Sequence, residues 1–226
     1  MADQNKVLVC LSVLLLLVVS LIVPTYAGTL RYDFDDIPPF KISSPNQKLQ
    51  IDGWERHREC FGVGVGAWFI SVEDGIVKVR DEGCGLGSIT GIYHTVDWTD
   101  YELKVRIQLR SRHPDAGGVH LYVRATPPPR AGILYFRGSY YRIWRDNPVH
   151  IGVWYDVRIV AEGNRIKYFF DGKKVGEETT GEMSGGVAFT AEMSELWLDY
   201  VEITDDILPV QPQGRLATCW AKLKQD

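Results

Sequence analysis

The feature that most constrains the fold is an alternation of apolar and polar residues, interrupted by Gly-containing turns, from residue 68 onward. In 101–109, Tyr, Leu, Val, Ile and Leu alternate with Glu, Lys, Arg and Gln. Because successive side chains of a strand point to opposite faces, this pattern predicts a strand with one buried and one solvated face. The dipeptides Asp74-Gly75 and Asp171-Gly172 separate such segments and predict tight hairpins.

Roughly a dozen segments of this kind, without a convincing helical period, predict an all-β fold, an antiparallel two-sheet sandwich. The other predicted strands are 68–73, 76–80, 119–124, 154–161, 166–170, 173–177, 186–191 and 195–204. Residues 36–66 are irregular and Gly-rich, so no strand is assigned there, although charged residues gather around Trp54. A short amphipathic helix fits Arg215–Gln225.

The N-terminus predicts export from the cytoplasm. The long apolar run 7–23 follows Lys6 and precedes Ala27, which favours a signal peptide cut after Ala27. The alternatives are an uncleaved membrane anchor and a buried core helix. We therefore expect a signal or anchor over 1–27, a sandwich over 28–206 and a tail over 207–226. The domain would be secreted or belong to the cell envelope, with membrane contact only through 7–23.

Three cysteines remain after the predicted signal, namely Cys60, Cys84 and Cys219. In an oxidising compartment two of them are expected to pair. Cys60 and Cys84 flank a predicted hairpin, which favours a bridge between them. The alternative is three buried or free thiols, and the pattern leaves the state of Cys219 open.

Charge is distributed unevenly along the chain. The formal net charge is −4, which argues against nucleic acid as a partner. Residues 101–145 nevertheless hold nine Lys and Arg residues and two acids. By alternation, three strands there would present basic and aromatic side chains on one wet face. The predicted ligand-binding residues are Arg106, His120, Tyr122, Arg124, Tyr140, Arg142 and Trp144.

Such a face suits a neutral or anionic polysaccharide or oligosaccharide, because aromatic rings stack on sugars and guanidinium groups bind carboxylate or sulfate. The alternative is a solvated face whose charges pair across the strands.

Six segments carry a resemblance to a known family. They are W-x-D-Y-E-L-x-V-x-I (98–107), G-G-V-H-L-Y-V-R (117–124), Y-Y-R-I-W-R-D (140–146), W-Y-D-V-R-I-V-A-E-G-N-R-I-K-Y-F-F-D-G-K-K-V (154–175), G-G-V-A-F-T-A (185–191) and L-W-L-D-Y-V-E-I (196–203). Together they resemble concanavalin A-like lectin/glucanase domains. Within that group the chain is most similar to laminin-G-like and secreted bacterial 3-keto-disaccharide-hydrolase-type modules. The resemblance covers about residues 29–204 and implies a jelly roll of two curved sheets, while its chemistry stays open.

The resemblance also implies a structural calcium site. Alternation places Asp199 on one face with Trp197 and Val201, which suggests that its carboxylate points between the sheets. In the resembled fold such an Asp often shares Ca²⁺ with the N-terminal strand, where Asp33 and Asp35 offer oxygen ligands. The alternatives are a salt bridge from Asp199 to Arg or Lys, or a bend that exposes it.

No catalytic motif stands out. The E-x-D-x-x-E string of the resembled glucanases is missing, and 192–195 lacks the middle acid and fits a turn. His120 could act as a base with distant partners, although a polar face residue is the simpler interpretation. We therefore expect an extracytoplasmic carbohydrate-binding module without catalysis of its own. The alternatives are a glycoside or 3-keto-disaccharide hydrolase and a cell-surface protein-interaction module.

Overall fold

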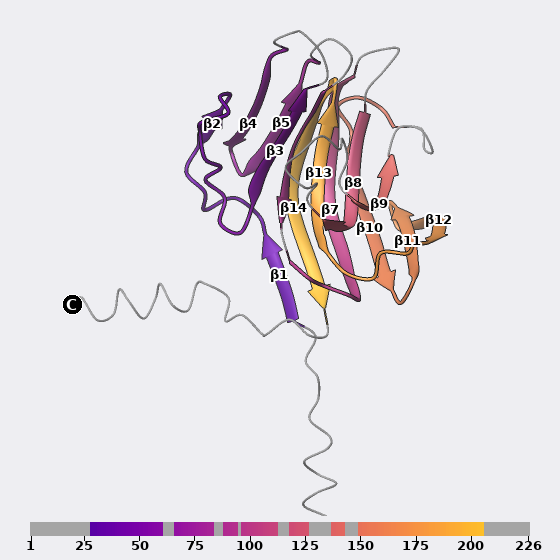
Figure 1. Ribbon diagram of the computed structural model, residues 1–226. Coiled ribbons are helices and arrows are strands. Elements are labelled where there is room, and N and C mark those ends of the chain that lie inside the picture. The colour runs from indigo at the N-terminus through magenta and orange to yellow at the C-terminus, as the bar shows by residue number, and fades with distance from the viewer. Residues whose placement is uncertain are drawn as a thin grey trace, which may run out of the picture. The chain divides into compact units, whose positions relative to one another are not determined.

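Two antiparallel sheets form the domain (Figure 1). The computed structural model describes residues 28–60, 66–83, 88–94, 96–112, 118–126, 137–142 and 149–205, with the backbone alone for 137–142. Within these ranges there is no helix, so no helix there could span a membrane. Thr29–Asp205 form one compact unit. The predicted signal, tail and C-terminal helix lie outside the described residues.

The larger sheet has nine strands in the order β12-β11-β10-β7-β14-β5-β4-β2, and β1 pairs with β14 beside this path. Its strands are β1 (Gly28–Tyr32), β2 (Phe40–Ile42), β4 (Trp68–Glu73), β5 (Ile76–Asp81), β7 (Tyr101–Arg112), β10 (Trp154–Glu162), β11 (Arg165–Phe170), β12 (Lys173–Thr179) and β14 (Ser194–Asp205). The smaller sheet runs β3-β6-β13-β8-β9. Its strands are β3 (Glu55–Cys60), β6 (Ser88–His94), β8 (Gly118–Thr126), β9 (Arg137–Arg142) and β13 (Gly186–Glu192). The predicted sandwich is confirmed.

The Asp-Gly hairpins form as predicted. β4 and β5 pair around Asp74-Gly75, whose φ values are 52° and 71°. β11 and β12 pair around Asp171-Gly172, with φ values of 45° and 76°. Both positions of each turn lie in the left-handed region, which Asp and Gly tolerate better than most residues and which matches the twist of a two-residue hairpin.

The region without predicted strands contains β2 and β3, so that prediction was wrong. β3 has the sequence ERHREC, in which no apolar residue alternates with the charged ones. It is an edge strand that pairs with β6 alone. An edge strand needs no continuous apolar face, and charged residues on it discourage pairing with other chains. The apolar alternation that reveals central strands is therefore missing from β3.

A buried arginine joins the loops at one end of the sandwich. Arg124 in β8 has a fully buried side chain and a φ of 53°, where the β8–β9 register shifts. Its Nε and Nη2 donate to the carbonyl oxygen of Thr99 at 3.0 and 2.8 Å. Its Nη1 donates to the carbonyl oxygen of Glu182 at 3.0 Å, and Nη2 also reaches Asp100 at 3.2 Å. Arg124 is thus a structural residue, and the prediction that it binds ligand on a wet face was wrong.

Replacement of this side chain tests its structural role. We expect Arg124→Gln to lower the free energy of unfolding by roughly 2–4 kcal/mol, because it leaves buried carbonyl groups without donors. Arg106→Gln is the control, since Arg106 is half exposed in a surface ion pair and should cost less than about 1 kcal/mol. Urea denaturation of both variants measures the difference, and equal losses would contradict the assignment.

Candidate functional site

The five-stranded sheet has one face toward the other sheet and one face away from it. Thr90 and Ser88 of β6 donate hydrogen bonds to the carboxylate of Asp81, which belongs to β5 of the opposite sheet. Phe189 packs on Trp54 in the buried core. By alternation and strand register, the intervening residues point outward. We call these residues the outer face: Glu55, His57, Glu59, Ile89, Gly91, Tyr93, Gly118, His120, Tyr122, Ala188, Thr190 and Glu192.

Two histidine–carboxylate pairs lie on the outer face. On β3, Nε2 of His57 lies 3.8 Å from Oε1 of Glu59. On the other side, Nε2 of His120 in β8 lies 3.9 Å from Oε2 of Glu192 in β13. β6 and β13 separate the strands that carry the two histidines. With strands spaced about 4.8 Å apart, the two histidine backbones are roughly 14 Å apart.

Aromatic and small residues occupy the space between the pairs. The Tyr93 hydroxyl donates to Glu55 at 2.7 Å, and the Tyr93 ring lies edge-on to His57, with centroids 6.5 Å apart. Tyr122 lies edge-on to His120 at 6.1 Å. The register of the central strands places Gly91 and Thr190 opposite each other. The outer face therefore has polar and aromatic side chains on both sides of a floor of small residues.

Burial sets the protonation of the β3 pair. It lowers the pKa of His57 from 6.5 to about 4, with a smaller effect from the positive charge of Arg56. Burial also raises the pKa of the Glu59 carboxyl. His57 is therefore neutral near neutral pH, where an unprotonated ring nitrogen can accept a hydrogen bond. Shifts of this kind concentrate at functional sites.

Two of the predicted ligand-binding residues lie on the outer face, but their side chains are buried and not solvent-exposed. His120 and Tyr122 are each 1 % exposed. The register of β9 against β8 places Tyr140 opposite Tyr122 and Arg142 opposite His120, as expected for neighbouring strands. Trp144 lies outside the described residues.

Arg106 does not belong to this face, so the prediction of one continuous surface was wrong. It lies in β7 of the nine-stranded sheet, whereas His120 and Tyr122 lie in β8 of the other sheet. Its Nη1 is 3.3 Å from Oδ2 of Asp199, and its guanidinium carbon is 5.6 Å from the Trp154 ring centroid. The chain changes sheets between β7 and β8, which alternation within a strand does not reveal.

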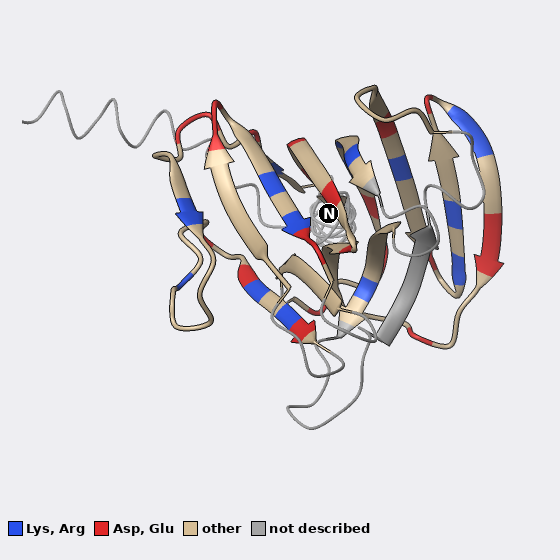
Figure 2. Ribbon diagram, turned by 90° about the horizontal axis from the view of Figure 1, so that it is seen from above, with Lys and Arg blue, Asp and Glu red and all other residues tan. Residues whose placement is uncertain are grey.

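The outer surface of the nine-stranded sheet matches the alternative prediction, namely a solvated face whose charges pair across the strands. Acidic and basic segments lie on neighbouring strands (Figure 2). Lys104 bridges Glu102 and Glu202, both at 3.1 Å, and Arg158 also contacts Glu102 at 2.8 Å. Rings on this surface are covered by cations, since Lys78 and Arg110 lie 4.7 and 4.3 Å from the Trp197 ring centroid.

The predicted calcium ligands do not come together. A shift of register between Leu198 and Tyr200 breaks the alternation of β14, so Asp199 points outward to Arg106, not between the sheets. Asp33 and Asp35 follow β1. The described part of the chain contains no group of three or more His, Cys, Asp or Glu side chains that could hold a metal.

The first and last strands do pair, as the resemblance implied, but through other contacts. The Thr29 and Thr204 hydroxyls are 3.3 Å apart, and Arg31 forms a salt bridge with Glu202 at 3.0 Å.

Cys60 is disulfide-bonded at the end of β3. Its predicted partner Cys84 and the third cysteine, Cys219, lie outside the described residues, so the pairing of Cys60 with Cys84 stays a prediction.

Four outer-face residues are not among the site residues predicted from the sequence: His57, Glu59, Tyr93 and Glu192. A signal did exist in β3, where Glu55, His57 and Glu59 recur at every second position. This spacing places them on one face of a strand. Because the remaining β3 residues include two arginines and no aliphatic residue, the period was not recognised as that of a strand.

The lowered pKa of His57 predicts a pH-dependent stability. Between pH 6.5 and about 4 the unfolded chain protonates His57 while the folded chain does not, so the free energy of unfolding falls as the pH falls. We expect His57→Gln to reduce this loss, measured by urea denaturation across the window. Burial also lowers the pKa of His94, so part of the loss should remain in the variant. An unchanged pH profile would contradict the neutral state of His57.

Solved structures with similar folds include lectins and carbohydrate-binding modules, whereas no curated protein matches the sequence. A protein of unknown function with a galectin-like fold from Bacillus subtilis has a TM-score of 0.53 at 10% identity, with 79% of this chain and 96% of that chain covered. This likeness confirms the galectin-like, concanavalin A-like sandwich.

Two further structures have lower scores. The carbohydrate-binding module CBM66 from Bacillus subtilis has a TM-score of 0.46 at 14% identity and covers 66% of this chain and 94% of its own. The exoplasmic/lumenal domain of VIP36, bound to Ca²⁺ and Man3GlcNAc, has a TM-score of 0.47 at 11% identity and covers 77% and 92%.

A family model gives the most specific result. The 3-keto-alpha-glucoside-1,2-lyase-like domain matches residues 42–204, which include every described strand except β1, the first two residues of β2 and the last residue of β14. This range also includes all residues of the outer face. The chain therefore belongs to the family of 3-keto-alpha-glucoside-1,2-lyase-like domains.

Proposed function

We propose that this protein is a saccharide-binding domain and that its binding site is the outer face of the five-stranded sheet. The observation that carries the proposal is the placement of two histidine–carboxylate pairs and two tyrosines around a floor of small residues. Imidazole, carboxylate and phenol groups together offer donors and acceptors for sugar hydroxyls. Family membership supports a glucoside as the ligand class.

The polar groups of the outer face are buried and held in position by the fold; Nδ1 of His120, for example, lies 3.4 Å from the Thr190 hydroxyl. The side chains of His57 and His120 are 12% and 2% exposed, so most of their cost of leaving water is already met in the folded protein. Groups that are already desolvated and held in position form hydrogen bonds to a ligand with little further ordering. A saccharide with several hydroxyls could therefore gain affinity from this face.

The location of the protein is a second part of this proposal. An exported or cell-envelope location is supported by the apolar run 7–23 and by the disulfide at Cys60, because disulfides persist mainly in oxidising compartments. Calcium binding is a separate proposal, which comparison of the melting temperatures with and without CaCl₂ tests.

A lyase is the second candidate function, and the neutral His57 beside Glu59 favours it. In a 3-keto-α-glucoside the ketone acidifies the proton on C2. A neutral imidazole could take that proton, the electron pair would form the C1–C2 double bond, and the C1–O bond would break. The leaving oxygen then takes a proton from a general acid; Glu59 could supply it in its protonated form, which burial favours by raising its pKa. On the β8 side of the outer face, His120 could act as the base and Glu192 as the acid in the same reaction.

Binding is tested by calorimetry and thermal melting against a panel of saccharides. We expect at least one glucoside to raise the melting temperature. His120→Gln and Tyr93→Phe should weaken that binding about tenfold, because each removes a hydrogen-bonding group from the outer face. Arg106→Gln, on the opposite sheet, should leave it unchanged. If the outer-face variants bind as tightly as the wild type, the site is wrong.

Catalysis is tested by product analysis with a 3-keto-α-glucoside. A lyase releases the leaving group and an unsaturated keto sugar, and His57→Gln should then lower the rate by a factor of about 10² or more. Binding without any product would support the binding module alone. Turnover that survives both His57→Gln and His120→Gln would rule out the proposed bases.

A further inference from the structure

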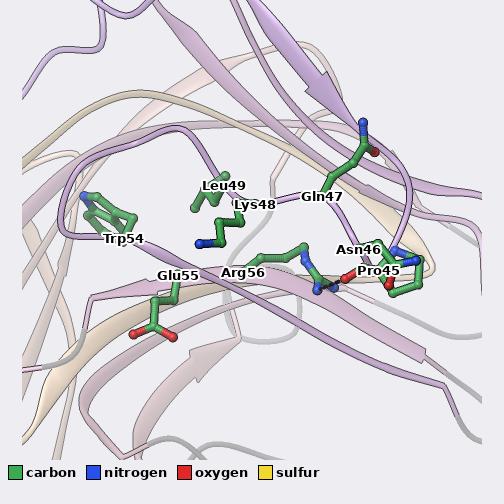
Figure 3. A pocket seen from close by; sticks show the side chains of 8 residues that line it. All are labelled: Pro45, Asn46, Gln47, Lys48, Leu49, Trp54, Glu55 and Arg56. Carbon is green, nitrogen blue, oxygen red and sulfur yellow. Dashed lines mark hydrogen bonds between the residues drawn. The ribbon is translucent and has the colours of Figure 1, made fainter.

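A pocket of about 450 Å³ opens beside the edge strand β3, outside the outer face (Figure 3). The loop 45–49 forms one side of it, and residues 54–56, where β3 begins, form the other. Its volume lies within the roughly 300–1,000 Å³ typical of small-molecule sites. β3 is the first strand of its sheet, so none of the described strands pairs with this edge.

Glu55 belongs to the outer face and also lines the pocket, but its side chain and that of Arg56 leave β3 on opposite sides. The carboxylate of Glu55 accepts a hydrogen bond from Tyr93 on the outer face. The next residue, Arg56, reaches the other way, because its Nη2 donates to the carbonyl oxygen of Pro45 at 2.9 Å and its guanidinium lies 5.4 Å from the Trp68 ring centroid. The two sites are therefore neighbours that share one strand.

Positive charge in the pocket is not neutralised by a salt bridge. Over the described ranges of the chain, neither Lys48 nor Arg56 forms an ion pair, in contrast to Lys104, which contacts two glutamates. Glu55 is the single acid among the lining residues, and its carboxylate is engaged by Tyr93. In Figure 3 the Lys48 side chain extends between Trp54 and Arg56, and the Glu55 carboxylate points away from it.

The loop is held in position without a ligand. Oε1 of Gln47 accepts hydrogen bonds from the backbone N–H groups of Ser43 and Ser44, at 2.9 and 3.0 Å. Arg56 fixes the same loop through Pro45. A preformed loop reduces the conformational entropy that binding would otherwise cost.

We propose that this pocket binds a carboxylate-bearing sugar, a uronate. Lys48 and Arg56 attract the carboxylate, the amide of Asn46 offers hydrogen bonds to hydroxyls, and Leu49 provides an apolar contact for the ring. The choice of a sugar rests on the proposed function, because the pocket adjoins the proposed saccharide site. The choice of an anion rests on the pocket's own charges.

Calorimetry of the full chain with D-glucuronate and D-glucose at low salt tests the proposal. We expect glucuronate to bind more tightly than glucose and to lose affinity as salt screens the charges. Lys48→Ala should weaken glucuronate binding about tenfold, because it removes a charged donor from an exposed position that the fold does not need. Lys173→Ala is the matched control, since it removes an exposed lysine from the far edge strand β12.

Equal affinity for glucuronate and glucose would overturn the proposal. Unchanged glucuronate binding in both Lys48→Ala and Arg56→Gln would overturn it as well. So would glucuronate binding that is lost in His120→Gln but kept in Lys48→Ala. Failure of the proposed function looks different. Neutral glucosides would then fail to bind, whereas glucuronate binding would still depend on Lys48.

Discussion

The hydroxyl of Tyr101 is the contact on which the arrangement of the two sheets depends. It donates to the carbonyl oxygen of Gly186 at 3.0 Å and accepts the backbone N–H of Arg124 at 2.6 Å. Tyr101 begins β7 of one sheet, and the other two residues belong to β13 and β8 of the other. Burial raises the pKa of Tyr101, so the phenol keeps its proton and remains a donor. The strands that carry His120 and Glu192 are positioned by this junction.

The polar side chains on the outer surfaces of the two sheets are in different environments. On the nine-stranded sheet, charges pair across strands and cations cover aromatic rings, so little is left for a ligand. On the five-stranded sheet, histidines and carboxylates are largely removed from water. Burial there lowers the pKa of His57 and raises that of Glu59, and shifts of this kind concentrate at functional sites, so this face, and not the more charged one, is the better candidate site.

Prediction from the sequence succeeded where the local residue pattern and the local turn chemistry agree. Asp74-Gly75 and Asp171-Gly172 predicted their hairpins because a two-residue turn demands backbone angles that these residues adopt. It failed where one extra residue in a strand, or a change of sheet between strands, reverses the direction in which a side chain points. The register shift at Asp199 turned a predicted metal ligand outward, and the crossover after β7 separated Arg106 from His120 and Tyr122. His57 and Glu59 were not predicted as site residues because β3 carries no apolar alternation.

The sequence by itself determined the all-β class, the central strands and the family, since these depend on the period of apolar residues and on turn chemistry along the chain. Only the tertiary structure decided which strands share a sheet, which face of each sheet is desolvated and which charges meet. His57 and Glu192 are far apart in the sequence and lie in one sheet because β6 pairs with both β3 and β13, the strands that carry them. That outcome depends on long-range hydrogen bonding and packing between strands, which no local pattern of residues specifies.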